Sequence, residues 1–490
     1  MQILKKLSLS NPFTIDLRSL ALSRIILGFF LFLNFYISAD DLTLFYTDYG
    51  LMPREALPIK FHGIRNLSIN VLSGSYWFQF LVLAAAFLAS ILFILGAFSR
   101  ISTFCSWILF LSFYNRNPLI VDGGDDALKL FLFWLCFLPV ASFFSVDKKS
   151  AQKSNTILCS ASAAFIIQLG SVYFFSALLK SSPQWRESGT ALHYALALGI
   201  FTSKFGDYLL NFPEFLKIMT TITWHNELIV PLFLLVPIFT NFFRSVAIIV
   251  FVGFHIGLII FMDLGLFPWI MISAWIALIP SYLWDLKIFS KLQEFIENFF
   301  SLLSKKIKTG VDAEPFFRTN DSTNLLCFAL TIYITLWNIR GTDYARFEPY
   351  FSHRLNFIGN SIRLDQYWAL FAPRPSQDGG WPVLSGHLVD KTIVSLPNGG
   401  PIDFRRPKTT ASFYKNFRWK KYYLNTWLKD NSQFRKYYAN YLCKSWNSTH
   451  SGDKKLKDLQ IIFMLENTLP PERQARRSYP QPNIIWEQGC

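Results

Sequence analysis

The sequence predicts a polytopic all-α membrane protein of about nine transmembrane helices, followed by a small C-terminal α+β domain. Composition is the first observation behind this prediction: of 490 residues, 52% are hydrophobic and only 16% are charged, far fewer than a soluble chain of this length carries. The second observation is that the apolar residues fall in blocks long enough to cross a bilayer. The third is that these blocks stop near residue 340, after which the sequence is mixed.

About nine apolar blocks are interpreted as membrane spans, separated from one another by polar or turn-forming residues. We expect residues 1–18 to form a basic interfacial segment, residues 19–285 one transmembrane domain, and residues 323–340 the last span. The blocks are Leu20–Ser38, Trp77–Phe98, Ile101–Tyr114, Leu128–Val146, Ile157–Leu179, Trp224–Phe239, Val246–Met262, Trp269–Trp284 and Thr323–Trp337. A shorter apolar piece, His193–Phe201, is interpreted as re-entrant or interfacial.

The linker at residues 286–322 contains a stretch whose apolar residues recur near helical spacing. Between Lys287 and Lys308, charged residues separate apolar residues such as Leu292 and Phe295. This pattern predicts an amphipathic helix that lies on the membrane surface instead of crossing it.

The C-terminal segment, residues 341–490, is expected to form a separate α+β domain. Residues 381–404 have a hairpin pattern with a Pro-Asn-Gly-Gly turn after the second strand. Two helices are predicted over Lys415–Lys429 and Ser432–Trp446, and a further strand over Leu459–Leu465. The aromatic and basic face of these helices has two interpretations: packing on the membrane domain or on lipid headgroups, or docking of a peptide or protein substrate.

The placement of lysine and arginine predicts the orientation of the chain. With alternating crossings, the basic regions fall on one side, which should be the cytoplasmic side: residues 1–18, Arg100, Asp147–Asn155, Arg244 and Lys287–Arg318. We therefore expect a multi-pass protein of the cell inner or plasma membrane, with a cytoplasmic N-terminus and an extracytoplasmic C-terminal domain. The loop with Arg54, Lys60 and Arg65 opposes this assignment, but the rule weakens in long loops.

Charge and cysteine content exclude several classes of function. Loop lysines and arginines explain much of the net charge of +15, and no recognisable nucleic-acid module accompanies it, so the expected partner is membrane lipid and not nucleic acid. The six cysteines form neither a metal-binding pattern nor a disulfide framework, and no metal is predicted. Cys443 and Cys490 could pair only if both lie outside the cytoplasm. No P-loop, zincin or nucleophile-elbow motif is present.

A lysine at the boundary of the fifth span is the main candidate for chemistry. The stretch Tyr173–Trp185 reads YFFSALLKSSPQW and places Lys180 where a long apolar run ends. One interpretation is an interfacial anchor that extends its ammonium to water. The other is a partly desolvated amine that acts as a base.

The predicted orientation brings further ionisable residues into the outer leaflet with Lys180. His225 and Glu227 begin the sixth span there, and Asp263 ends the seventh span there. His255 lies about 12 Å deeper in the seventh span. We expect these five residues to line one cavity, with Lys180 and His255 catalytic and the others binding substrate or cofactor. Alternatively, His255 is a hydrogen-bonded core histidine and Glu227 is a carboxylate at a helix N-terminus.

Arg24 lies inside the first span and is counted among the candidate substrate- or cofactor-binding residues. An arginine within an apolar run is costly when it faces lipid. We therefore expect its side chain to be buried against Asp or other polar partners near one end of the span.

Three segments of the membrane domain carry distinctive motifs: LRSLALSRIILGFFLF at residues 17–32, FYTDYGLMPRE at residues 45–55 and RNPLIVDGGD at residues 116–125. Together they resemble the horizontally transferred transmembrane (HTTM) domain, a family related to the vitamin K-dependent gamma-carboxylases. The stretch YFFSALLKSSPQW is similar to the carboxylase segment that carries the catalytic lysine, which matches Lys180. Residues 253–272, GFHIGLIIFMDLGLFPWIMI, resemble a later carboxylase helix with a histidine. The resemblance covers roughly residues 12–285.

The resemblance implies a membrane enzyme whose cofactor is a reduced, vitamin K-like quinone. In the carboxylases the lysine deprotonates the reduced quinone, and a substrate glutamate is then carboxylated with CO2. The chain departs from this pattern in two places. The segment Tyr114–Pro118 has no histidine, and the C-terminal domain is not recognisable as the carboxylase substrate domain.

Three classes of function remain open. The first is a quinone-dependent, carboxylase-like lyase or oxidoreductase with Lys180 as base. The second is a non-catalytic membrane protein that binds or helps mature an exported peptide, or that supports a redox partner. The third is a transporter, although no internal repeat or pair of broken spans supports it.

Overall fold

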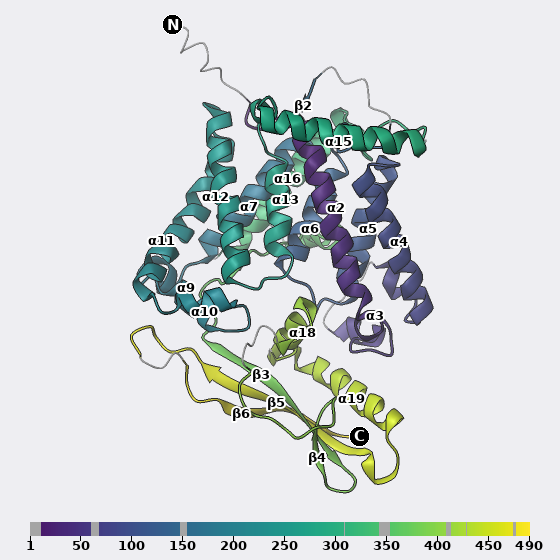
Figure 1. Cartoon of the computed structure of the whole chain (residues 1–490), viewed down its shortest axis with the longest axis vertical. Helices are drawn as coiled ribbons and strands as arrows, with labels where there is room; N and C mark the ends of the chain where they lie inside the picture. The colour runs from purple at the N-terminus through teal and green to yellow at the C-terminus, as the bar shows by residue number, and fades with distance from the viewer. Residues whose placement is uncertain are drawn as a thin grey trace.

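A bundle of helices with a small sheet domain at one end makes up the computed structural model (Figure 1). Most of the predicted interfacial segment 1–18, the basic residues Lys148–Lys153, and the loop residues Lys60 and Arg65 lie outside the described part of the chain. The structure describes residues 11–59, 68–147, 154–307, 309–342, 353–407, 413–427, 429–473 and 477–490.

Six helices among the described residues are long and apolar enough to cross a membrane. They are α2 (Leu17–Ala39), α4 (Tyr76–Leu95), α7 (Ser160–Leu179), α11 with the 3-10 helix η4 (Pro213–Ile229 and Val230–Leu235), α12 (Thr240–Phe261) and α16 (Asp321–Gly341). Large apolar side chains such as Leu81, Ile249 and Leu325 are exposed on their outer faces, where lipid would cover them. These helices make the chain a multi-pass membrane protein.

The prediction of about nine spans is not confirmed, because three of the predicted blocks do not form long apolar helices within the described residues. The helix α5 (Ser99–Arg116) has 18 residues but is polar at both ends. The helices α6 (Gly123–Leu135) and α13 (Phe267–Ile276) have only 13 and 10 residues. Pro139 and Pro280 follow them and cannot continue a helix. All three are largely buried among the other helices, where a short or polar helix avoids lipid.

Short helices and turns close the end of the bundle that faces the C-terminal domain (Figure 1). They include α3 (Leu42–Tyr46), α8 (Pro183–Arg186), α9 (Ala191–Ala197) and α10 (Lys204–Leu209). The piece predicted as re-entrant or interfacial, His193–Phe201, forms most of α9 and the turn after it, and nearly all of it is buried. Other short elements are β1 (Ile15–Asp16) paired with β2 (Thr156–Ile157), α14 (Ser281–Trp284), α17 (Asn356–Ile362) and the 3-10 helices η1 (Arg54–Ile59), η3 (Ile69–Val71), η5 (His353–Leu355), η7 (Lys429–Phe434) and η8 (Gly452–Lys454).

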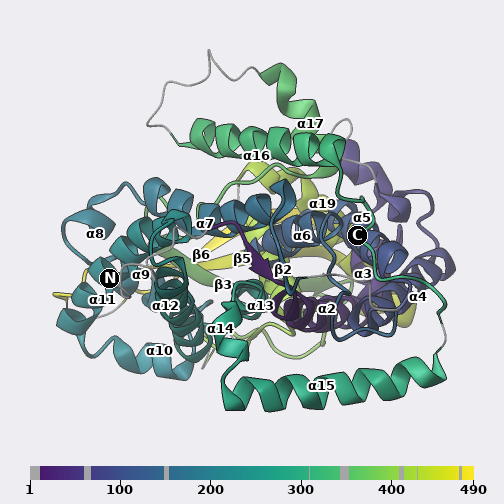
Figure 2. The ribbon, with the colours of Figure 1, turned by 90° about the horizontal axis from the view of Figure 1, so that it is seen from above.

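The opposite end of the bundle carries α15 (Lys287–Lys306) (Figure 1). Seen from above, α15 runs along one edge of the bundle and α16 lies at the other edge (Figure 2). Phe300 is buried against the bundle, whereas Phe295 is 72% exposed. The helix predicted over Lys287–Lys308 is therefore present, with one apolar face packed on the bundle and a second apolar stripe left open.

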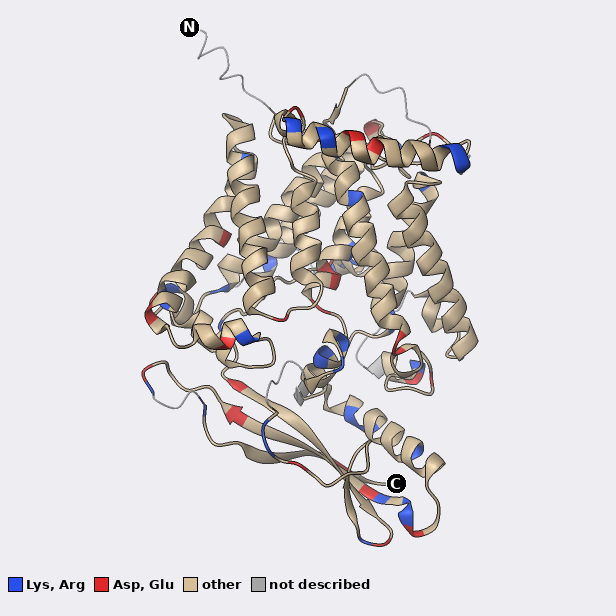
Figure 3. Cartoon of the chain, viewed as in Figure 1, with Lys and Arg blue, Asp and Glu red and all other residues tan. Residues whose placement is uncertain are grey.

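Charged residues gather at the two ends of the bundle (Figure 3). Many of them belong to α15 or to the C-terminal domain, while the middle of the bundle is mostly uncharged. The charges that do lie inside the bundle, such as Arg24, Lys129 and Lys180, are buried and have polar partners. This distribution is typical of a protein whose middle is embedded in a membrane.

The C-terminal domain contains one antiparallel sheet with two helices against it (Figure 1). The predicted hairpin, helices and strand are confirmed within a few residues at each end. A further edge strand was not predicted; it contains Pro482, which an edge strand tolerates. The strand order is β4 (Ile393–Ser395), β3 (Asp378–Leu388), β5 (Leu456–Asn467) and β6 (Gln481–Gly489), and the helices are α18 (Phe417–Trp427) and α19 (Arg435–Thr449).

A disulfide joins α19 to the residue that follows β6. Cys443 and Cys490 form this bond, with their Cα atoms 5.4 Å apart. The pairing that the sequence left open is therefore made. Disulfides persist in oxidising compartments and are rare in the cytosol.

Side chains of α18 tie the C-terminal domain to the bundle. Arg418 pairs with the Asp125 carboxylate of α6 and donates a hydrogen bond to Asn34 Oδ1 of α2 (3.0 Å). Asn34 Nδ2 in turn donates to Asp125 Oδ1 (2.9 Å), and all three residues are buried. Lys420 pairs with Asp263, which follows α12. At these positions the basic face of the domain packs on the membrane domain.

Candidate functional site

The end of α7 presents three polar side chains on one helix face. Tyr173, Ser176 and Lys180 are three and four residues apart, so they lie one above another along the helix. Lys180 is the C-cap residue, and Pro183 begins α8 shortly after it, so the chain turns away at this point. Arg186 Nε donates a hydrogen bond to the Lys180 carbonyl oxygen (3.0 Å) and holds the turn.

Lys180 is buried, with 2% of its surface exposed. Its Nζ donates a hydrogen bond to Ser176 Oγ (2.8 Å) and pairs with the Glu227 carboxylate of α11. Nζ also lies 4.9 Å from the centre of the Trp185 ring, which is a cation–π contact. An interfacial anchor would extend its ammonium into water, so this position favours the interpretation of a desolvated amine.

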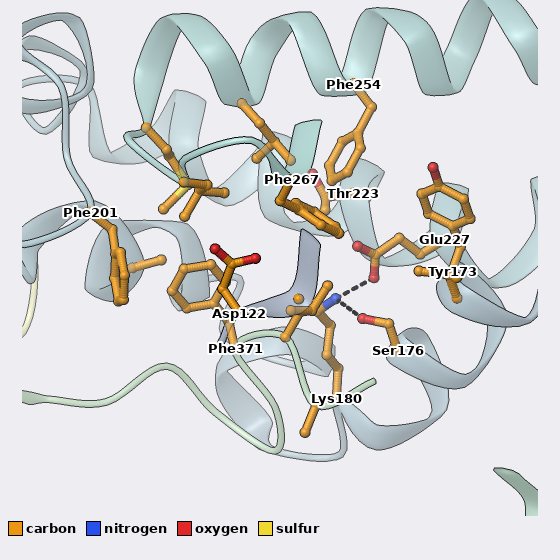
Figure 4. Close-up of a pocket in the computed structure, with 18 of the residues that line it drawn as sticks. Asp122, Tyr173, Ser176, Lys180, Phe201, Thr223, Glu227, Phe254, Phe267 and Phe371 are labelled. Carbon is orange, nitrogen blue, oxygen red and sulfur yellow. Dashed lines mark hydrogen bonds and ion pairs between the residues drawn. The ribbon is translucent and has the colours of Figure 1, made fainter. Parts of the chain in front are cut away.

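Lys180 and Glu227 line a cavity of about 270 Å³ at the end of the bundle that meets the C-terminal domain (Figure 4). Its walls come from five helices, α7, α8, α9, α11 and α12, from the segments that lead into α6 and α13, and from the C-terminal domain. The aromatic lining residues include Phe201, Phe254, Phe267, Phe371 and Phe417, and the polar ones are Asp122, Tyr173, Ser176, Lys180, Thr223, Glu227 and Lys421. A mostly apolar hollow with a few convergent polar groups is the usual form of a small-molecule site.

His255 lies behind one wall of the cavity and is fully buried. Its Nε2 forms a hydrogen bond of 2.7 Å with the Tyr173 hydroxyl, and that oxygen accepts a hydrogen bond from Trp275 Nε1 (2.7 Å). Tyr173 lines the cavity, so His255 is linked to the site through one side chain. The structure therefore places His255 as a hydrogen-bonded core histidine next to the site.

Two predicted site residues lie elsewhere. His225 is exposed on the outer face of α11, where its Nδ1 is 2.8 Å from the Thr221 carbonyl oxygen. Asp263 is exposed at the junction with the C-terminal domain, where it pairs with Lys420. Of the five residues predicted to line one cavity, only Lys180 and Glu227 do so; the prediction is wrong for His225 and Asp263, and His255 lies behind the wall. His225 and Glu227 are separated by about 200° around a helix, so only one of them can face the bundle.

Arg24 is fully buried in α2, in the part of the bundle that packs on α15. Its guanidinium donates hydrogen bonds to the backbone oxygens of Val140 (3.0 Å), Ile94 (3.2 Å) and Phe144. This is the burial expected from the cost of an arginine that faces lipid. Arg24 joins three chain segments and does not line the cavity.

The segment before α6 supplies a site residue that the sequence did not predict. Asn115 Oδ1 accepts a hydrogen bond from Arg363 (2.7 Å), and Asn117 Nδ2 donates one to the Phe45 carbonyl oxygen (3.0 Å). Both asparagines therefore hold chain segments together. Asp122, in contrast, caps α6 and lines the cavity. Its signal was hidden because a Gly-Gly pair with flanking Asp also predicts an ordinary turn.

Three further residues that line the cavity were not predicted from the sequence. Tyr173 and Ser176 carry a detectable signal, because they stand at helical spacing from Lys180 within an apolar run. Trp185 has no such signal in the sequence, because it follows a turn whose path the sequence does not specify.

A metal-dependent site is not supported by the described residues, which contain no group of three or more His, Cys, Asp or Glu side chains able to hold a metal ion. The cavity offers instead the Lys180 amine, the carboxylates of Glu227 and Asp122, and hydroxyl groups. Groups of this kind can bind a polar oxygen and move a proton.

The fold and the site together define a multi-pass helical membrane protein with a buried lysine–glutamate pair in an apolar cavity. Residues 13–284 match the model of the HTTM domain family, so the chain belongs to this family. The recognition made from the sequence is thereby confirmed. Comparisons with curated proteins and with solved structures found no match.

Proposed function

We propose that this protein is a membrane enzyme of the carboxylase-like kind, which binds a reduced quinone in the cavity and uses Lys180 as its base. One observation carries the proposal: Lys180 Nζ is buried at the wall of an apolar cavity, beside a carboxylate that can take its proton. A base needs a neutral amine, which Lys180 becomes in this proposal when its proton passes to the Glu227 carboxylate.

The lining of the cavity fits the ring of a quinone. Its volume of about 270 Å³ is close to the lower end of the range for small-molecule pockets, about 300–1,000 Å³. Phe254, Phe267 and Phe371 offer flat apolar faces, and Ser176 and Thr223 offer hydroxyl groups for ring oxygens. A bound quinone would supply the redox chemistry that these side chains lack.

Each polar residue around Lys180 has a distinct task in this proposal. Ser176 Oγ accepts a hydrogen bond from Nζ and fixes the direction of the amine. Glu227 holds the ammonium when Lys180 is protonated and accepts its proton when the neutral amine is needed. The aromatic rings exclude water, which strengthens the interactions between these groups.

Extraction of lipid-soluble molecules from the purified protein tests the proposal. We expect a quinone to co-purify with the wild-type protein and to be at least about tenfold depleted from Lys180→Ala, because a hydrogen bond to a charged group contributes about 1.5–3 kcal/mol. Lys217→Ala is the matched control, since Lys217 pairs with Glu214 on the surface of α11. Equal quinone content in wild type and Lys180→Ala, or none in either, would contradict the proposal.

The C-terminal domain supports a second candidate function, the docking of a peptide. A hollow of about 1040 Å³ is lined by β3, β4, α18 and α19. Its walls combine aromatic side chains, such as Trp381 and Trp419, with the basic side chains of Arg406 and Lys415. Such walls suit a peptide segment with acidic and aromatic residues. The peptide would be the substrate of the enzyme or, in the non-catalytic alternative, an exported chain that the protein binds or helps mature.

We propose that the end of the bundle with the C-terminal domain faces the extracytoplasmic side. The basic residues of α15 lie at the other end, in agreement with the preference of lysine and arginine for cytoplasmic loops (Figure 3). The disulfide between Cys443 and Cys490 also supports this orientation, because disulfides persist in oxidising compartments and are rare in the cytosol.

Cysteine labelling in intact cells tests this orientation. We expect Ser451→Cys, on an exposed loop of the C-terminal domain, to react with a membrane-impermeant maleimide. Ser290→Cys, on the exposed face of α15, should react only after the membrane is permeabilised. The unsubstituted protein measures the background from its native cysteines. The reverse pattern would place the C-terminal domain in the cytoplasm.

A further inference from the structure

Asp122 combines a structural bond with a free oxygen at the cavity. Its Oδ1 accepts hydrogen bonds from the backbone N–H groups of Gly124 (2.6 Å) and Asp125 (3.1 Å), and so caps α6. The backbone N–H of Asp122 donates to Asp125 Oδ2 (2.9 Å), which completes a reciprocal capping box. In the part of the chain that the structure describes, Oδ2 of Asp122 accepts no hydrogen bond from protein. The cap therefore needs only one of the two carboxyl oxygens.

The position of Asp122 connects two hollows. It lines the cavity of Lys180 and Glu227, and Figure 4 shows its carboxyl group pointing in among the aromatic rings. It also lines a second hollow of about 370 Å³ between the bundle and the C-terminal domain, together with Arg418 and Lys420. A group in the wall between the two hollows can exchange protons with both sides.

The buried position of Asp122 brings its titration close to neutral pH. Burial, and then the nearby Asp125 carboxylate, raise the pKa of Asp122 from 3.8 to about 7. Arg418 and Lys421 of α18 act in the opposite direction. Lys180 and Glu227 face the same cavity as an ion pair.

We propose that Asp122 is a second acid–base group of the cavity, which holds or releases a proton of the bound ligand at Oδ2 while Lys180 acts at Nζ. The proposal rests on the proposed function and deepens it. Two separate proton-carrying groups in one apolar cavity fit a ligand with two ionisable oxygens on a flat ring, as in a hydroquinone. The proton on Asp122 would leave through the hollow beside Arg418 and Lys420 and not through the membrane.

The test uses Asp122→Asn in the full chain. Asparagine caps helices about as well as aspartate but cannot titrate, so the variant keeps α6 and removes the proton site. Asp122→Ser serves the same purpose should the asparagine variant fold poorly. Asp126→Asn is the control, because Asp126 lies on the same helix, pairs with Lys129 and does not line the cavity.

The first measurement is the binding of a reduced naphthoquinone to the purified protein at different pH. We expect the affinity of the wild-type protein for the reduced naphthoquinone to change about tenfold between about pH 6 and about pH 8. The protonated fraction of a group with a pKa near 7 changes about tenfold over the same range. Asp122→Asn should lose this change, and Asp126→Asn should keep it. An unchanged pH dependence in Asp122→Asn would overturn the proposal, while binding that still requires Lys180 would leave the proposed function standing.

The second measurement is the unfolding temperature of the protein without added quinone. Because the folded protein has the higher pKa, Asp122 contributes stability below its unfolded pKa of about 4, and this stability is lost as the pH rises through about 7. We therefore expect Asp122→Asn to gain stability relative to wild type as the pH rises over this range. A constant difference between the two proteins would overturn the proposal, even if no quinone binds.

Discussion

The substitution Lys180→Arg is expected to lower quinol-dependent activity at least about 100-fold, the lower range of what general-base catalysis contributes. Arginine keeps the positive charge and can still pair with Glu227, but it is not deprotonated in proteins and so cannot act as a base. The measurement is the oxidation of a reduced naphthoquinone by dissolved dioxygen, catalysed by the purified protein in lipid nanodiscs. The unfolding temperature of the variant shows whether the fold is kept.

Two comparisons make the result decisive. Lys217→Arg changes a surface lysine that pairs with Glu214 on α11, and it should leave the activity unchanged. Lys180→Ala should lose activity as Lys180→Arg does. If Lys180→Arg is fully active while Lys180→Ala is inactive, the lysine serves as a cationic anchor, and the enzymatic proposal fails.

The substitution Arg418→Met is expected to lower the free energy of unfolding by about 3–5 kcal/mol, the usual effect of removing one partner from a buried ion pair. Without Arg418, the Asp125 carboxylate stays buried between α6 and α18 with no opposite charge. Phe417 and Lys421, which flank Arg418 on α18, line the cavity, so activity should fall as well. Thermal unfolding of the full chain in detergent measures the loss.

A double substitution separates the ion pair from general damage. Arg418→Met combined with Asp125→Asn should cost less than the sum of the two single changes, because neither charge is then left unpaired. Arg405→Met is the control, since the Arg405–Asp403 pair lies on the surface and should not affect the unfolding temperature. Additive effects of the two buried changes would show that Arg418 and Asp125 do not stabilise the junction together.

Much of the fold could be predicted, because long apolar blocks are a strong local signal. Blocks such as Leu20–Ser38 and Val246–Met262 correspond to α2 and α12, whose ends differ from the prediction by a few residues. Hydropathy was less informative for α6, where Leu128–Val146 reads as one span. The helix α6 has only 13 residues, Gly123–Leu135, and ends well before Val146. The surrounding helices cover the segment and remove the need for a full crossing.

The candidate site was predicted only in part. The end of an apolar run identified Lys180, and its partner Glu227 was among the expected residues. His225 was included because it begins the predicted sixth span at the outer leaflet together with Glu227, but the helix turns it to the opposite face. Asp122 was missed, because it lies about 60 residues before Lys180 and its local pattern is already explained by a turn.

The sequence by itself determined that this chain is an HTTM-family membrane protein, and it identified a lysine at a helix end as the residue of interest. These properties depend on composition and on neighbours within a few residues. Only the tertiary structure decided that Ser176 and Asp122 share the cavity with Lys180 and Glu227, and that the C-terminal domain supplies part of its wall. Such contacts join residues far apart in the chain, and the rotation of each helix about its axis, set by packing against its neighbours, selects which side chains meet.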